Sequence, residues 1–155
     1  MLEVKDLIIN FLNEVARDIK QNQSAQGRTA SGRTANSLEA EADDNTGILY
    51  GSVSVNALET GRKSGRVPAG FKDVIKQWMS DKGIFQAESD SKKNSIAYLI
   101  ARKIAREGTA LYRSGGNSGV LSTVLTDDRI SGFESQILKR YGREIQNEVI
   151  ITFGK

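Results

Sequence analysis

Residues 38–55 read LEAEADDNTGILYGSVSV, and this stretch decides the class of fold. Up to Asp43, acidic residues alternate with leucine or alanine, which is the period of a strand that buries one face. The sequence DDNTG at 43–47 favours a tight turn, and apolar residues return after it at Ile48, Tyr50, Val53 and Val55. The stretch therefore predicts an antiparallel β-hairpin, with a bulge at Gly51.

The chain before the hairpin predicts a long helix over residues 2–21. Apolar residues recur there at spacings of three and four, which places on one helical face the residues Val4, Leu7, Ile8, Phe11, Leu12, Val15 and Ile19. Residues 22–36, NQSAQGRTASGRTAN, lack this period and consist mostly of small and polar residues. They predict a flexible basic loop with a short helical turn at its end.

After the hairpin, residues 61–69 predict a basic loop that holds the only proline of the sequence. A helix is predicted next, ending at Gly83, because glycine is favoured just after a helix C-terminus. Its predicted core face consists of Phe71, Val74, Ile75 and Trp78.

A second middle helix is predicted to be capped by Ser95 and to end at Gly108. Its predicted core face consists of Ile96, Leu99, Ile100 and Ile104. A Gly/Ser-rich loop at 113–119 and a short strand-like run then lead to a final helix, capped by Asp127 or Asp128. The inner face of this helix is predicted to consist of Ile130, Phe133, Ile137, Tyr141 and Ile145.

These elements predict a single α+β domain over residues 1–155. A small antiparallel sheet carries a long N-terminal helix, two middle helices and a C-terminal helix packed on it. The apolar, β-branched residues VIITF at 149–153 favour a terminal strand.

The composition excludes most familiar kinds of active site. The chain has no cysteine and no histidine, so disulfides, thiolate metal sites and His-dependent catalytic couples are absent. No apolar run approaches the roughly 20 residues of a membrane helix, and the N-terminus lacks the pattern of a signal peptide. The sequence therefore predicts a protein of the cell interior or of a virus particle, without catalysis, cofactor or membrane contact.

Charge is distributed unevenly along the chain, although the formal net charge is only +3. Residues 38–60 hold five acidic and no basic residues, a local charge of −5, whereas residues 61–82 hold six basic and two acidic residues, a local charge of +4. Neighbouring segments of opposite sign predict charged faces that meet each other or a second copy of the chain. Solvated faces of alternating sign are the ordinary alternative.

Two motifs have alternative interpretations. The tetrad Gly-Arg-Thr-Ala occurs at 27–30 and again at 32–35, but it follows a helix and lacks the spacing of a phosphate-binding loop. Its arginines remain able to touch phosphates without sequence selectivity. The acids at 39–44 are either a Mg²⁺ site or, as alternate strand residues ordinarily are, a solvent-facing surface.

Three short motifs follow one another in a recognisable order. An Ala-x-Glu-x-Gly segment follows the hairpin, a proline-led helix ends in Lys-Gly-Ile, and Ile-Ala-Arg-x-Ile runs into Gly-Thr. The residues that carry them are Ala57, Glu59, Gly61, Pro68, Lys82, Gly83, Ile84, Ile100, Ile104, Gly108 and Thr109. Over residues 30–150 this order resembles the tail-completion or head–tail joining (neck) proteins of tailed bacteriophages. Thr60 stands where an aromatic residue is common in that family.

The resemblance implies a structural virion protein rather than an enzyme. Such a protein forms a homo-oligomeric ring in the connector, assembled in the bacterial cytoplasm, with portal or adaptor proteins and tail proteins as partners. Genomic DNA passes through the ring without sequence-specific contact. The residues expected to contact a neighbouring subunit or partner are Arg28, Arg33, Glu39, Glu41, Asp43, Arg62, Lys63, Arg66, Tyr112 and Arg113.

Two other functions are compatible with the residues. One is a non-specific nucleic-acid-binding module, which would use Arg28, Arg33, Arg62, Lys63 and Arg66. The other is a carboxylate-dependent hydrolase or nuclease built on Glu39, Glu41 and Asp43.

Overall fold

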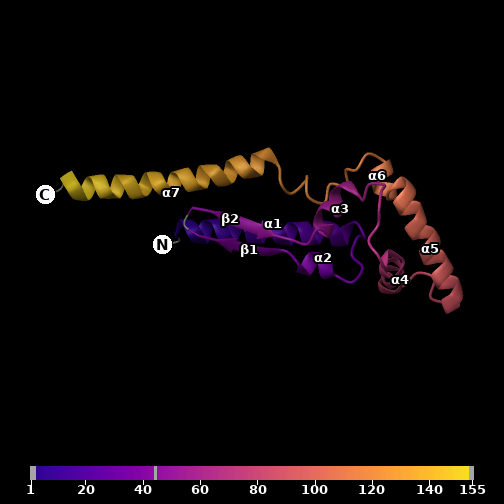
Figure 1. The fold of residues 1–155 in the computed structure, drawn as a ribbon. Helices are drawn as coiled ribbons and strands as arrows, with labels where there is room; N and C mark the ends of the chain where they lie inside the picture. Colours follow the sequence, from indigo (N-terminus) through magenta and orange to yellow (C-terminus); the bar gives the residue numbers. More distant parts are fainter. Residues whose placement is uncertain (1–2, 44, 154–155) are drawn as a thin grey trace.

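The computed structural model describes residues 3–43 and 45–153, with side chains up to Arg143. The chain forms an elongated α+β molecule, in which a long helix and the hairpin lie side by side and the last helix runs back along them (Figure 1). The main elements are α1 (Val4–Ala25), β1 (Glu39–Ala42), β2 (Gly47–Tyr50), α4 (Phe71–Asp81), α5 (Asp90–Glu107) and α7 (Asp127–Phe153). Three short helices lie in the connections, namely α2 (Arg33–Asn36), α3 (Ser54–Thr60) and α6 (Ala110–Arg113). The predicted α+β fold class is confirmed.

The antiparallel hairpin packs one face on α1 and turns the other outward. Ala40 of β1 pairs with Leu49 of β2, both are partly buried, and Leu49 packs on the core beneath. The hairpin approaches α1 closely at Gly47, where a Cβ atom would lie 2.3 Å from Cγ2 of Ile8 and 2.9 Å from Cδ1 of Leu12. A residue without a side chain is therefore required where β2 begins.

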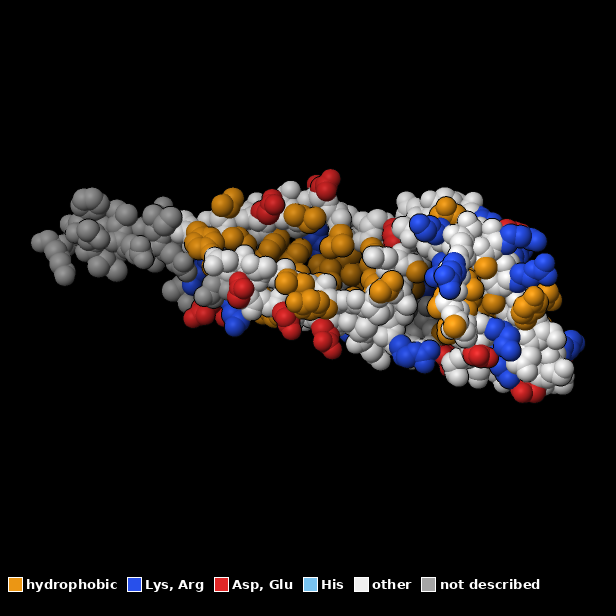
Figure 2. All heavy atoms as spheres, in the orientation of Figure 1, with side chains coloured by type: hydrophobic (Ala, Val, Ile, Leu, Met, Phe, Trp, Pro, Cys, Tyr) orange, Lys and Arg blue, Asp and Glu red, His pale blue; other side chains and the backbone are white. Residues whose placement is uncertain are grey.

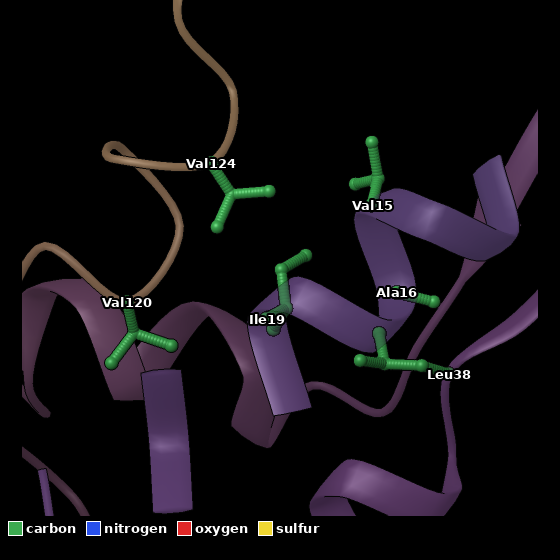
Figure 3. Packing of buried hydrophobic residues seen from close by; sticks show 6 residues of the cluster. All are labelled: Val15, Ala16, Ile19, Leu38, Val120 and Val124. Atoms are coloured by element: carbon green, nitrogen blue, oxygen red, sulfur yellow. The ribbon is translucent and has the colours of Figure 1, made fainter. Parts of the chain in front are cut away.

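The first hydrophobic core joins the middle of α1 to the chain just before α7 (Figure 3). Its buried residues are Val15, Ala16 and Ile19 of α1, Leu38 beside the hairpin, and Val120 and Val124 of the connection to α7. Burial of one aliphatic side chain contributes on the order of 1.5–3 kcal/mol. The two valines therefore fix the loop at 120–124 on α1, although about 100 residues of chain separate them.

The second core lies between α4 and α5 at the other end of the molecule. Ile75 and Met79 of α4 pack against Ala97 and Ala101 of α5. The alanines lie one turn apart on α5, and their small side chains allow the two helices to approach closely. The middle helices therefore form a unit with a core of its own.

Helix α7 is attached to α1 near its start. The rings of Phe11 and Phe133 stack with centroids 4.1 Å apart, and Nη1 of Arg129 donates to Oδ2 of Asp18 at 2.9 Å. From there the backbone of α7 continues as helix through Phe153, well past the beginning of α1 (Figure 1). The predicted terminal strand at 149–153 is therefore wrong.

The second strand is shorter than predicted. It ends at Tyr50, and Val53 and Val55 belong to the start of α3. Val53 is 91% exposed, whereas Val55 packs on the first core from the first turn of α3. Val53 and Val55 are β-branched and therefore favour a strand in the sequence, but Val55 packs on the core from a helix.

Three predicted element boundaries are wrong. Helix α1 continues to Ala25, so the predicted flexible loop starts inside it. Helix α5 begins six residues earlier than predicted, because Ser89 and not Ser95 forms the N-cap: its side chain accepts a hydrogen bond from the amide of Lys92. Helix α7 begins at Asp127, and the hydroxyl of Thr126 accepts from the amide of Arg129.

Other predictions fail on burial or on strand formation. Trp78 and Leu99 were expected in the core, but they are 39% and 61% exposed. The strand-like run at 120–125 consists of turns, among the described residues. The exposed Trp78 lies at a pocket described below.

Gly47→Ala is expected to weaken the fold by about 1–3 kcal/mol, since the new methyl group must displace Ile8 and Leu12 of α1. The measurement is urea-induced unfolding followed by circular dichroism. Gly132→Ala on α7 is the matched control, because nothing lies within 4 Å of its added Cβ; it should stabilise by about 0.5–1 kcal/mol. Equal stability of the wild-type and Gly47→Ala chains would contradict the tight seating of the hairpin.

Candidate functional site

The outward face of the hairpin combines acidic and apolar side chains. Glu39 lies opposite Tyr50 and Glu41 lies opposite Ile48 in the strand register, and all four side chains are exposed. Neither glutamate forms an ion pair among the described residues. The predicted acidic face is therefore present, and it also carries the large apolar side chains of Ile48 and Tyr50.

Asp43 does not join this face but organises the hairpin turn. Its Oδ1 accepts hydrogen bonds from the amides of Asn45 and Thr46 at 2.8 and 2.7 Å. These two bonds lower the pKa of Asp43 below its ordinary value. Among the described side chains, which cover 3–43 and 45–143, no group of three or more acidic residues is arranged to hold a metal ion.

The basic residues gather around an apolar pocket of about 640 Å³ between the two cores. Its floor is formed by the aliphatic and aromatic residues Leu58, Phe71, Ile75, Trp78, Ile100, Ile104 and Leu111. The charged residues that line it are Arg28, Arg62, Lys82, Lys103 and Arg113. Figure 2 shows Lys and Arg side chains gathered over the α4–α5 end, and acidic and hydrophobic ones over the hairpin end.

Arg62 is fixed at the edge of this pocket by contacts with α6 and α4. Its amide donates to Oγ1 of Thr109 at 2.9 Å, and its carbonyl accepts from the amide of Thr109 at 2.9 Å. The guanidinium stands 5.2 Å from the centre of the Phe71 ring and donates to the carbonyl of Arg66 at 3.0 Å. The preceding residue, Gly61, has φ 73°, and a Cβ there would lie 2.5 Å from Oγ1 of Thr109. The basic loop is therefore held against the start of α6 and not free.

The other predicted basic residues are divided between the pocket and the surface. Arg28 and Arg113 line the pocket, and Arg113 is 3.6 Å from the Glu107 carboxylate. Arg33 lies outside it and is 3.8 Å from Asp81. Lys63, Arg66 and Tyr112 are exposed and are not among the described lining residues.

Glu59 is the residue whose role the sequence did not reveal. From α3 its carboxylate accepts four hydrogen bonds from the loop before α7. The donors are the amide of Leu121 at 2.8 Å, the hydroxyl of Ser122 at 2.6 Å, the hydroxyl of Ser118 at 3.2 Å and the amide of Gly119 at 3.3 Å. The sequence showed Glu59 only as part of the Ala-x-Glu-x-Gly segment, because its donors lie about 60 residues away.

These hydrogen bonds determine the ionisation of Glu59. Partial burial opposes its charge, but the bonds from Leu121, Ser122, Ser118 and Gly119 outweigh burial and lower its pKa below the ordinary value. The folded chain therefore holds the charged form more strongly than the unfolded chain does. The resulting stability is complete above the unfolded pKa and is lost as the pH falls through the folded pKa.

A second apolar hollow lies between α1 and α7. It has a volume of about 400 Å³ and is visible in Figure 2 as a band of hydrophobic side chains beside the hairpin. Its lining includes Ile8 and Phe11 of α1 and Phe133, Ile137 and Tyr141 of α7. The two long helices thus leave part of their shared apolar surface uncovered.

Comparison with known protein families, curated proteins and solved structures gives no match to this chain. Among the described residues, no helix is long and apolar enough to cross a membrane.

Glu59→Gln is expected to lower the free energy of unfolding at pH 7 by about 1–3 kcal/mol, since two amides and two hydroxyls lose a charged acceptor. The difference from wild type should shrink below about pH 4.3, where glutamate is protonated in the unfolded chain. Urea unfolding from pH 3 to pH 8 measures both effects. Glu14→Gln, exposed on α1, is the control; a pH-independent effect of Glu59→Gln would refute the ionisation argument.

Proposed function

We propose that this protein is a structural virion subunit of the phage neck, which forms a homo-oligomeric ring joining the capsid portal to the tail around the DNA channel. The observation that carries this proposal is the separation of two uncovered faces of opposite charge on one elongated chain. The hairpin face is acidic and apolar, and the pocket is cationic and apolar.

Two different complementary faces suit a head-to-tail assembly. A contact between unlike patches repeats from copy to copy, and it closes into a ring when the rotation between neighbours allows closure. A contact in which the same patch of each copy meets its counterpart would instead favour a two-fold dimer. Opposite charges on separate parts of the chain therefore favour the ring that the order of motifs suggests.

A structural role without catalysis also agrees with the composition. The chain contains no histidine or cysteine, and Asp43, the acidic residue beside the two hairpin glutamates, is engaged in the turn. The proposed partners are further copies of the chain, portal or adaptor proteins, tail proteins and DNA in transit. The proposed location is the virion neck, after assembly in the bacterial cytoplasm.

The nucleic-acid-binding alternative gains little from the geometry. The basic residues on which it depends do not form one surface: Arg33 lies 3.8 Å from the Asp81 carboxylate, and Arg33, Lys63 and Arg66 lie outside the pocket that Arg28 and Arg62 line. Aromatic side chains that could stack on bases do not alternate with them. Such binding should fall steeply with salt.

The purified chain is expected to elute as a multimer of defined mass in size-exclusion chromatography with light scattering, and to appear as rings by negative-stain electron microscopy. Peptides of the chain should also be found by mass spectrometry in particles of the virus that encodes it. A chain that remains monomeric and is absent from those particles would refute the proposal. Salt-sensitive DNA binding by a monomer would favour the alternative.

A further inference from the structure

The pocket between the two cores has an apolar floor and charged residues of only one sign. Its described lining contains five cationic side chains and no carboxylate. The only ion pair that any of the five forms among the described residues is between Arg113 and Glu107, at 3.6 Å. Arg28, Lys82 and Arg62 instead donate to uncharged oxygens of Gln26, Gly27 and Arg66. A ligand for this pocket should therefore be apolar and acidic together.

The floor of the pocket presents large apolar side chains to solvent. Trp78 is 39% exposed, and the neighbouring Phe71, Ile100 and Ile104 are only partly buried. Exposed aromatic and aliphatic side chains inside a concave, charged rim are typical of a protein-binding surface. An exposed tryptophan is also among the residues that contribute most when an interface covers them.

The outward face of the hairpin has the matching chemistry. Glu39 and Glu41 stand two residues apart on β1, with Tyr50 and Ile48 opposite them on β2. Tyr50 is 47% exposed and Ile48 is 44% exposed. Two adjacent residue pairs of the same hairpin face thus present two carboxylates and two large apolar side chains.

We propose that the pocket lined by Trp78 and Lys103 is the receptor for the Glu39, Glu41, Ile48 and Tyr50 face of a second copy of this chain. This assignment rests on the proposed ring, and it identifies the contact that builds it. Each copy has one hairpin face and one pocket, and these lie at different places on its surface. The pocket of each copy would therefore bind the hairpin of one neighbour, and its own hairpin would bind the pocket of the other neighbour. The apolar side chains supply affinity, and the charges select the orientation.

A charge exchange tests this contact. Variant E39K/E41K makes the hairpin cationic, and variant R28E/K103E makes part of the pocket acidic. Each is expected to associate at least about tenfold more weakly than wild type, because like charges then face each other. The fourfold variant that carries both changes should associate more strongly than either double variant, since its two introduced lysines can pair with its two introduced glutamates; Arg62, Lys82 and Arg113 stay cationic in every variant. Light scattering over a dilution series gives the association constants.

Two kinds of control separate this contact from net charge. E14K/E134K and K72E/R102E make the same changes of charge at exposed positions outside the hairpin face and the pocket, and both should assemble like wild type. Trp78, the only tryptophan of the chain, reports on the pocket itself. Its emission should shift to shorter wavelength as the wild-type chain assembles, and it should not shift over the same concentrations in E39K/E41K.

The results show separately whether the proposed hairpin–pocket contact or the proposed ring is wrong. If wild type assembles but the two charge variants assemble equally well, or the fourfold variant fails to recover, the hairpin–pocket contact is refuted and the ring proposal stands. If R28E/K103E fails to assemble while E39K/E41K assembles like wild type, the hairpin is refuted as the occupant of the pocket, and a different apolar, acidic segment is favoured. A wild-type chain that is monomeric throughout would overturn both proposals.

Discussion

The carboxylate of Glu59 joins α3 to the loop that precedes α7. It holds the loop before α7 by four hydrogen bonds, and that loop inserts Val120 and Val124 into the core on α1. Two residues after Glu59, the chain turns at Gly61 into the basic loop that borders the pocket. A charged acceptor is suited to this position, because hydrogen bonds to charged groups are stronger than neutral ones. Glu59 therefore anchors the loop that leads into α7 from a helix that leads into the basic loop at the pocket.

The division of the interior into two small cores explains why so much apolar surface remains uncovered. One core lies on α1 and the other between α4 and α5, and the pocket occupies the space between them. A chain of this size gathered around one core would bury a larger share of its apolar side chains. Here Trp78, Tyr50 and Ile48 remain substantially exposed. An elongated chain with two separate cores leaves this apolar surface exposed at the expense of its own stability.

The elements that sequence could predict are those whose burial pattern is local. Alternation identified the hairpin, and the three-and-four spacing identified α1, because each element buries one face on its neighbours. The end of β2 was missed, since Val55 is apolar in either a strand or a helix. Exposure of Trp78 was missed because periodicity assigns a helix one apolar face but does not reveal whether that face is fully covered. Glu59 was missed because its donors are distant in sequence and close only after folding.

The charge pattern of the sequence located two regions of opposite sign, but it could not define the surfaces that carry them. Asp43 lies in the acidic region and serves the turn, while Lys63 and Arg66 lie in the basic region and outside the pocket lining. Arg28 and Lys103 come from outside these two regions and meet Arg62 and Lys82 of the basic region only at the pocket. Such convergence requires a folded chain, in which hydrogen bonds to Thr109 hold Arg62 at the pocket. The proposed contact with a neighbouring copy thus depends on the folded chain and not on the basic loop alone, since a segment excised from the pocket would lack the arrangement of charge around an apolar floor.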